Sequence, residues 1–347
     1  MESPTVGNRA LSHAIVRSLC LFTERLGPHE GARLDRLATR IEEAGYTLQT
    51  RRICVAGHGP AEVEACYGDG VRFLSVGQLD RRGLEHNFEA LLATDNVACN
   101  FAPEGPVTAD DVAWLYRLIE AQPGQTFGFA YTFANAPGSP FFPSATWAGN
   151  GFALGLQPTD LAAGCDTPEV WLERVRGAWL ALQALFADEA DFLGIDGSIA
   201  PLWDTPGSLV GHVRRWAGSF ERAVTSDLFL RITGFLREAN PCPVGLNGLM
   251  LPCLEDRQLA GEYEQGRFSI ERNLFLAMHC GLGIDTYPLG TDESPQRVLE
   301  ILRLVQGLAT RHAKPLSVRL ISDGSARIGE RTGFGNRYLH DVVVRKL

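Results

Sequence analysis

The stretch from Pro241 to Gly290, PCPVGLNGLMLPCLEDRQLAGEYEQGRFSIERNLFLAMHCGLGIDTYPLG, decides the fold class of this chain. Two short apolar runs, Val244–Leu251 and Gly281–Ile284, each end in Gly, Pro and acidic residues. A segment long enough for an amphipathic helix lies between them. Short apolar runs bounded by turn residues are typical of buried strands. The stretch therefore predicts a strand, a loop, a helix and a second strand.

The rest of the chain repeats this alternation. Strands are predicted at His13–Phe22, Thr47–Val55, Val71–Val76, Val97–Phe101, Thr126–Phe133, Gly151–Leu156, Phe192–Ile195, Pro315–Ile321 and, at the end, Tyr338–Leu347. Helices are predicted at Arg33–Ala44, Leu84–Thr94, Ala109–Glu120, Thr167–Asp188, Val210–Trp216, Asp227–Glu238 and Pro295–Arg311. Strands separated by helices pair in parallel, and about ten strands exceed an eight-stranded barrel. We therefore expect residues 1–347 to form a single large α/β barrel domain, built as one ring or as two half-barrels facing each other.

One connection breaks the alternation. Residues Asn135–Trp147, NAPGSPFFPSATW, carry three prolines and cannot form a helix. Long ordered loops of this kind are more often functional than decorative.

Composition limits the classes of function. The chain has 347 residues, 45% of them apolar and 21% charged, and a net charge of −9 without long charge runs. This balance argues against a nucleic-acid or membrane surface and favours a small-molecule partner. The N-terminus lacks a signal-peptide cleavage pattern, no apolar run is long enough to cross a membrane, and the eight cysteines are scattered. We expect a cytoplasmic protein with reduced thiols, either alone or as a homo-oligomer.

Several segments, in this order, resemble the uncharacterised family known as domain of unknown function 711. They are IVRSLCLF, SPFFPSATW followed by FALGLQPTDL, FLGIDGSIAP, GLNGLMLPCLEDRQLA and HCGLGIDTYPLGTDESPQRVLEIL. The resemblance implies a barrel similar to that of the pyruvate formate-lyase class of glycyl radical enzymes, with about ten strands in two five-stranded halves. It implies no reaction. The family often has a His after the Pro-rich loop, where this chain has Ala145, Thr146, Trp147 and Ala148, so a mechanism that needs that His is not expected.

Glycyl radical chemistry is not expected either. The segment Arg331–Gly335, RTGFG, is only superficially similar to a radical-storing glycine loop, and no two cysteines are adjacent. A Gly-rich turn before a last strand explains this segment equally well.

Carboxylates are the strongest candidates for chemistry. Asp196 and Asp285 each follow Gly-Ile at the end of an apolar run, and Glu255 follows another. Because ligands bind where the carboxyl ends of parallel strands meet, we expect these three side chains to converge as catalytic residues. Clustered carboxylates raise one another's pKa, so either a divalent cation binds them or one holds a proton. Oxygen ligands favour Mg, Ca or Mn over Zn, although His58 and His279 keep Zn open. The opposing interpretation is that each acid only caps a helix or forms a turn.

Further polar residues are predicted on the same rim. Asn100, Asn247, Trp147 and Asp256 are candidate substrate-binding residues. His58, Glu104, Asp204 and Asp323 also follow predicted strands or loops there. Three arginines, Arg17, Arg51 and Arg52, would suit a substrate carboxylate, but they fit outward strand positions equally well. Trp147 and Trp203 are either stacking walls or packing residues.

These residues leave two classes of function open. The first is an enzyme that acts on a small polar metabolite by carboxylate acid/base chemistry of the lyase, hydrolase or isomerase type, with or without a divalent metal. The second is a non-catalytic small-molecule-binding or regulatory barrel. Clustered acids favour the enzyme, because a sensor gains nothing from their repulsion. No nucleotide cofactor is expected, since the chain has neither a GxGxxG sequence after a strand nor a GxxxxGK[ST] sequence.

Overall fold

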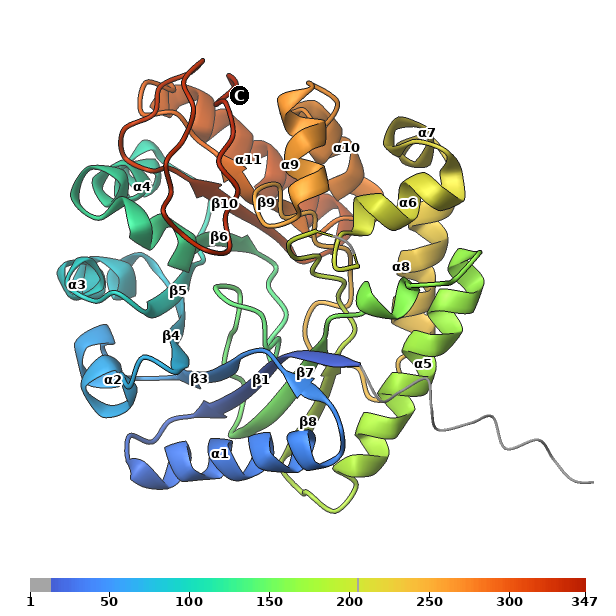
Figure 1. The fold of residues 1–347 in the computed structure, drawn as a ribbon. Helices are drawn as coiled ribbons and strands as arrows, with labels where there is room; N and C mark the ends of the chain where they lie inside the picture. The colour runs from blue at the N-terminus through green and yellow to red at the C-terminus, as the bar shows by residue number, and fades with distance from the viewer. Residues whose placement is uncertain (1–13, 205) are drawn as a thin grey trace, which may run out of the picture.

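The computed structural model describes residues 14–204 and 206–347 (Figure 1). Residues 1–13 lie outside the described part. They include His13 of the predicted first strand and the segment in which no signal peptide is expected. Thr205 also lies outside it.

One sheet organises the molecule, with strand order β8-β7-β1-β3-β4-β5-β6-β10-β9 and β2 beside β1. The strands are β1 (Ile15–Thr23), β2 (Thr47–Leu48), β3 (Arg51–Val55), β4 (Arg72–Leu79), β5 (Val97–Phe101), β6 (Phe129–Phe133), β7 (Gly151–Leu156), β8 (Phe192–Asp196), β9 (Gly283–Pro288) and β10 (Leu316–Ile321). Pairing is parallel except at β1–β7 and β6–β10, which are antiparallel. The predicted large α/β barrel-like fold is therefore confirmed as a ten-stranded sheet in two halves that run in opposite directions.

The edge strands β8 and β9 are joined by an irregular segment, residues 243–252. It makes isolated bridges from Ile195 to Pro243, from Leu249 to Gly281 and from Pro252 to Asp285. The predicted strand Val244–Leu251 is therefore wrong. Pro243 and Pro252 have no N–H to donate, and Asn247 has a φ of 47°, so this segment cannot sustain a ladder.

Helices cover the outside of the sheet (Figure 1). They are α1 (Pro28–Glu43), α2 (Pro60–Tyr67), α3 (Arg81–Leu92), α4 (Ala109–Ala121), α5 (Pro168–Leu185), α6 (Leu209–Ala217), α7 (Phe220–Val224), α8 (Leu228–Ala239), α9 (Arg257–Glu264), α10 (Ile270–His279) and α11 (Pro295–His312). Their apolar faces and the outer face of the sheet form one core that includes the fully buried Trp171 and Trp179. None of the helices in the described chain combines the length and apolar character needed to cross a bilayer.

The chain ends in an irregular segment rather than the predicted strand. After β10, residues 322–347 form only an isolated bridge between Arg331 and Val343. The segment is tied down by its backbone: His340 N donates to Leu254 O at 2.8 Å, and Leu347 N donates to Glu293 Oε2 at 2.9 Å. A sheet edge is therefore not available to it, and the segment crosses one end of the barrel instead (Figure 1).

The Pro-rich connection between β6 and β7 enters the barrel interior (Figure 1). Asn100 of β5 holds it there, because Asn100 Nδ2 donates to Pro143 O at 3.0 Å and to Ala145 O at 2.9 Å. Around Ala145 a small apolar cluster forms inside the barrel, with Cys20 and Cys54 among its members. The loop thus fills the middle of the barrel and separates its two ends.

Candidate functional site

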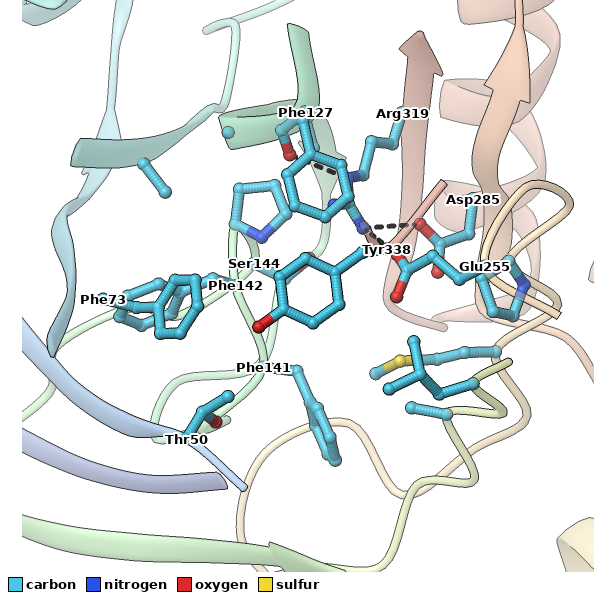
Figure 2. Close-up of a pocket in the computed structure, with 18 of the residues that line it drawn as sticks. Thr50, Phe73, Phe127, Phe141, Phe142, Ser144, Glu255, Asp285, Arg319 and Tyr338 are labelled. Atoms are coloured by element: carbon cyan, nitrogen blue, oxygen red, sulfur yellow. Dashed lines mark hydrogen bonds and ion pairs between the residues drawn. The ribbon is translucent and has the colours of Figure 1, made fainter. Parts of the chain in front are cut away.

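A cavity of about 570 Å³ lies at one end of the barrel. It is lined by residues near the beginnings of β1, β3, β4 and β5, such as Arg17, Arg52 and Phe73, and by Asp285 and Arg319 from β9 and β10. The amino ends of the first-half strands thus form one side of this cavity, and residues from the first part and middle of β9 and β10 contribute to the other side. Figure 2 shows the inner loop, β10 and the C-terminal Tyr338 converging on it.

The centre of the site is a chain of ion pairs. Arg17 Nη2 donates to Glu255 Oε2 at 3.1 Å, and Arg319 Nη1 donates to Glu255 Oε1 at 3.0 Å. The same Arg319 nitrogen donates to Asp285 Oδ1 at 3.1 Å (Figure 2). Sharing one nitrogen brings the carboxyl groups of Glu255 and Asp285 together. Two of the three predicted catalytic acids therefore lie side by side in the cavity.

The two acids differ in environment. Glu255 is the charge partner of two arginines, and its side chain is only 7% exposed, whereas that of Asp285 is 19% exposed. Burial raises the pKa of Asp285 above its ordinary value, the Arg319 charge lowers it, and the Glu255 charge raises it again. Asp285 is thus the more accessible of the two acids, and its own pKa is raised above the ordinary value. Asp285 was predicted to follow the end of a strand, but it lies within β9.

Local backbone geometry turns Arg17 toward the cavity. In a regular strand, Arg17 would share a face with Leu19 and Leu21, which belong to the outer core. The pairing register of β1 with β7 shifts between Val16 and Ser18, and across this irregularity Arg17 lines the cavity instead. The bulge is therefore what brings a cation to Glu255.

Of the two adjacent arginines of β3, only one belongs to the site. Arg51 faces outward, where its two terminal nitrogens pair with Asp35 and Glu42, each at 3.2 Å. Arg52 is 8% exposed and lines the cavity. Burial, followed by the charge of Arg17, lowers the pKa of Arg52 to about 9, so the group remains protonated at neutral pH.

Aromatic rings form the walls of the cavity. Tyr338 stacks on Phe127 and on Trp203 with ring centroids 6.2 Å apart in each pair, and it makes an edge contact with Phe73 at 6.2 Å. Phe142 of the inner loop lines the same space (Figure 2). The C-terminal segment therefore places one ring across the aromatic wall of the site.

Asp196 is separate from this cavity and is not among the residues that line it. Its Oδ1 accepts hydrogen bonds from Ser198 N, Ser198 Oγ and Asn247 N, and its Oδ2 accepts one from Leu246 N at 3.0 Å. Asn247 in turn accepts a hydrogen bond from Gly197 N at 2.9 Å through its Oδ1. Asp196 and Asn247 together fix the irregular segment beside β8.

Asp256 lies next to Glu255 in sequence but caps α9. Its Oδ1 accepts hydrogen bonds from Gln258 N and Leu259 N, and its Oδ2 accepts one from Leu209 N. Its full burial raises its pKa to about 6. It therefore orients the chain after Glu255 without facing the cavity.

Trp147 and His58 lie at the other end of the barrel. They line a second hollow of about 730 Å³ with Glu62 and His86, at the carboxyl ends of β3 and β4. The single rim predicted from parallel strands is therefore split between two ends, because the halves of the sheet are antiparallel.

The donor set for a metal is incomplete in the described part of the chain. No three His, Cys, Asp or Glu side chains come together there in a way that could hold a metal ion. Glu255 and Asp285 offer two carboxyl groups, and both already face Arg319. His279, a candidate for Zn, bonds through Nδ1 to the carbonyl of Phe275 at the end of α10. All eight cysteines are free.

Sequence reasoning missed two central residues, Arg319 and Tyr338. Arg319 interrupts the apolar run LSVRLI of β10, and a charge in a strand predicted to be buried was an available signal. Tyr338 gave no such signal, since it falls in a segment that is irregular in the structure.

Comparison with known proteins confirms the resemblance to an uncharacterised family. Residues 177–335 match the family described as "Uncharacterised ACR (DUF711)". A "UPF0210 protein" of Pyrobaculum arsenaticum is 33% identical over 100 residues, and one of Syntrophobacter fumaroxidans is 26% identical over 100 residues. Each match covers 29% of this chain and 22% of the relative, so the chain spans about a fifth of the length of these curated relatives. The region matched by the family includes Glu255, Asp285 and Arg319 but neither Arg17 nor Arg52.

Proposed function

We propose that this chain is an enzyme that acts on a small polar metabolite by acid/base chemistry at the Glu255–Asp285 pair. The observation that carries the proposal is the sharing of Arg319 Nη1 by both carboxyl groups, at 3.0 and 3.1 Å, inside a cavity of substrate size. Paired acids whose environments differ are the usual basis for assigning a proton carrier and a charged partner.

In this proposal Asp285 exchanges the proton. It is the more exposed of the two acids, and its raised pKa brings it closer to neutral pH, where a general acid or base works best. Glu255 is a positioning residue: it holds Arg17 and Arg319 in place, and Arg319 orients Asp285. The chemistry is of the lyase, hydrolase or isomerase type, and no step is assigned to a metal or a radical.

The test is a proton-exchange assay with a defined set of compounds. Pyruvate, lactate, phenyllactate and phenylacetate would be incubated with the protein in deuterated water, and loss of the signals of the C–H groups next to their carbonyl or carboxyl groups would be followed by proton NMR. We expect exchange of at least one compound, slowed about 100-fold or more in Asp285→Asn. Asp227→Asn is the matched control, since Asp227 is 72% exposed on α8 and should leave the rate unchanged.

Exchange that is absent, or equal in the wild type and Asp285→Asn, would contradict catalysis at this pair. It would favour the second candidate, a barrel that binds a small molecule without turning it over. The observation that favours this second candidate is that an arginine engages each Glu255 oxygen, which suits a structural ion pair better than a catalytic base.

A further inference from the structure

We infer that the ligand of this cavity is a small organic monocarboxylate with a flat apolar body, and that Arg52 binds its carboxylate. This inference rests on the proposed function, since it names the substrate class of the same site. It follows from the charge of the cavity, the support of Arg52 and the aromatic walls.

The buried charges of the cavity do not balance. Arg17, Arg52 and Arg319 are each less than 9% exposed, and the acids beside them in the cavity are the buried Glu255 and the partly buried Asp285. Glu255 pairs with both Arg17 and Arg319, and Asp285 pairs with Arg319. Among the described residues Arg52 has no carboxylate partner, and a buried cation without one is costly. One negative charge from a ligand would complete the set.

Arg52 is held in place by its surroundings. Its Nε donates to Thr50 Oγ1 at 2.9 Å, and Thr50 Oγ1 donates to Arg17 O at 2.6 Å. The centre of its guanidinium lies 5.1 Å from the centroid of the Phe142 ring and 5.8 Å from that of Phe73. In the described chain no acceptor is recorded for its two terminal nitrogens. A guanidinium fixed in this way presents a two-pronged donor, the geometry that a carboxylate matches.

The aromatic walls of the cavity indicate the shape of the rest of the ligand. Phe73, Phe127, Phe142, Trp203 and Tyr338 all line the cavity, and a flat apolar group gains most by lying among such rings. The volume of about 570 Å³ suits a small molecule. A phosphate group, with nearly two negative charges, exceeds the single positive charge that Arg17, Arg52 and Arg319 leave over after Glu255 and Asp285. The combination therefore favours a flat monocarboxylate over a phosphorylated or neutral ligand.

The first experiment uses benzoate as the probe. Titrations of the 347-residue chain by isothermal calorimetry would compare benzoate with its neutral analogue benzamide and with inorganic phosphate. We expect benzoate to bind at least about 10-fold more tightly than either. Equal binding of benzamide, or preferred binding of phosphate, would overturn the inference, and this comparison does not depend on any variant folding.

The second experiment assigns the anion site with two neighbouring residues. Arg52→Gln should weaken benzoate binding about 10-fold or more, and Arg52→Lys should retain part of it. Arg51→Gln is the matched control, because Arg51 lies on the same strand but pairs outward with Asp35 and Glu42. Equal benzoate binding by wild type and a folded Arg52→Gln, or an equal loss in Arg51→Gln, would overturn the assignment.

The two proposals fail in different ways. If proton exchange is absent while benzoate binding depends on Arg52, only the proposed catalysis is wrong. If Asp285→Asn abolishes exchange but benzoate binding does not depend on Arg52, only the substrate class is wrong.

Discussion

Arg17 donates a hydrogen bond to Glu255 at 3.1 Å although 238 residues separate the two in sequence. The contact joins the first strand of one half of the sheet to the short stretch between the irregular segment, residues 243–252, and α9. Both side chains are less than 10% exposed. A buried ion pair of this kind ties folding of the two halves to assembly of the site.

We expect Glu255→Gln to destabilise the protein by about 3–5 kcal/mol, because Arg17 would lose its carboxylate partner and Arg319 one of its two, while both arginines remain buried. Chemical denaturation in urea measures this. Glu300→Gln is the control, since Glu300 is 54% exposed in a surface pair with Arg297 and should cost less than about 1 kcal/mol. Similar costs for the two variants would contradict a structural role for the Arg17–Glu255–Arg319 contacts.

We expect Asp196→Asn to cost roughly 1–3 kcal/mol of stability and to leave benzoate binding unchanged. The new amide nitrogen would face backbone donors that now bond to the carboxylate, such as Leu246 N at 3.0 Å and Asn247 N at 3.1 Å. Urea denaturation and calorimetry test the two parts. A variant as stable as the wild type that no longer binds benzoate would instead place Asp196 in the binding site.

Asp256 should make stability depend on pH. Its pKa is raised to about 6 in the folded protein, so the folded state holds this proton more tightly than the unfolded state does. The resulting stabilisation is complete below about pH 4 and is lost as the pH rises through about 6. Asp256→Asn removes this titration. Denaturation curves between those pH values should differ in slope by up to about 1.4 kcal/mol per pH unit, whereas parallel pH profiles would show that Asp256 does not contribute.

Tyr338→Ala should raise the exposure of Trp203 above its present 43%, because the Tyr338 ring stacks on Trp203 at 6.2 Å. Acrylamide quenching of tryptophan fluorescence is expected to increase in Tyr338→Ala and to stay unchanged in Tyr338→Phe, which keeps the ring. In a Trp203→Phe background, Tyr338→Ala and Tyr338→Phe should show equal acrylamide quenching. Quenching that does not respond to Tyr338→Ala would mean that the C-terminal segment does not shield the site in solution.

Much of the fold was predictable because each element carries its own local signal. Apolar runs bounded by Gly and Pro located strands such as Val97–Phe101 and Gly151–Leu156 with the bounds that the structure has. The two wrong strand predictions lie in segments where tertiary contacts replace the regular hydrogen bonding of a β-ladder. Val244–Leu251 and the C-terminal residues are apolar enough for strands, but Pro243 and Pro252 flank the first and make only isolated bridges, and the second pairs with no strand of the sheet.

By itself the sequence determined the fold class and most of the buried strands, and it singled out Glu255 and Asp285 as candidates, since periodicity and acids after apolar runs are local properties. Only the tertiary structure decided which residues meet. The antiparallel junctions β1–β7 and β6–β10 split the predicted rim between two ends of the barrel. A register shift of one residue in β1 turns Arg17 toward Glu255. Side-chain direction in a strand reverses at every residue, so such a shift changes the site without leaving a mark in the sequence.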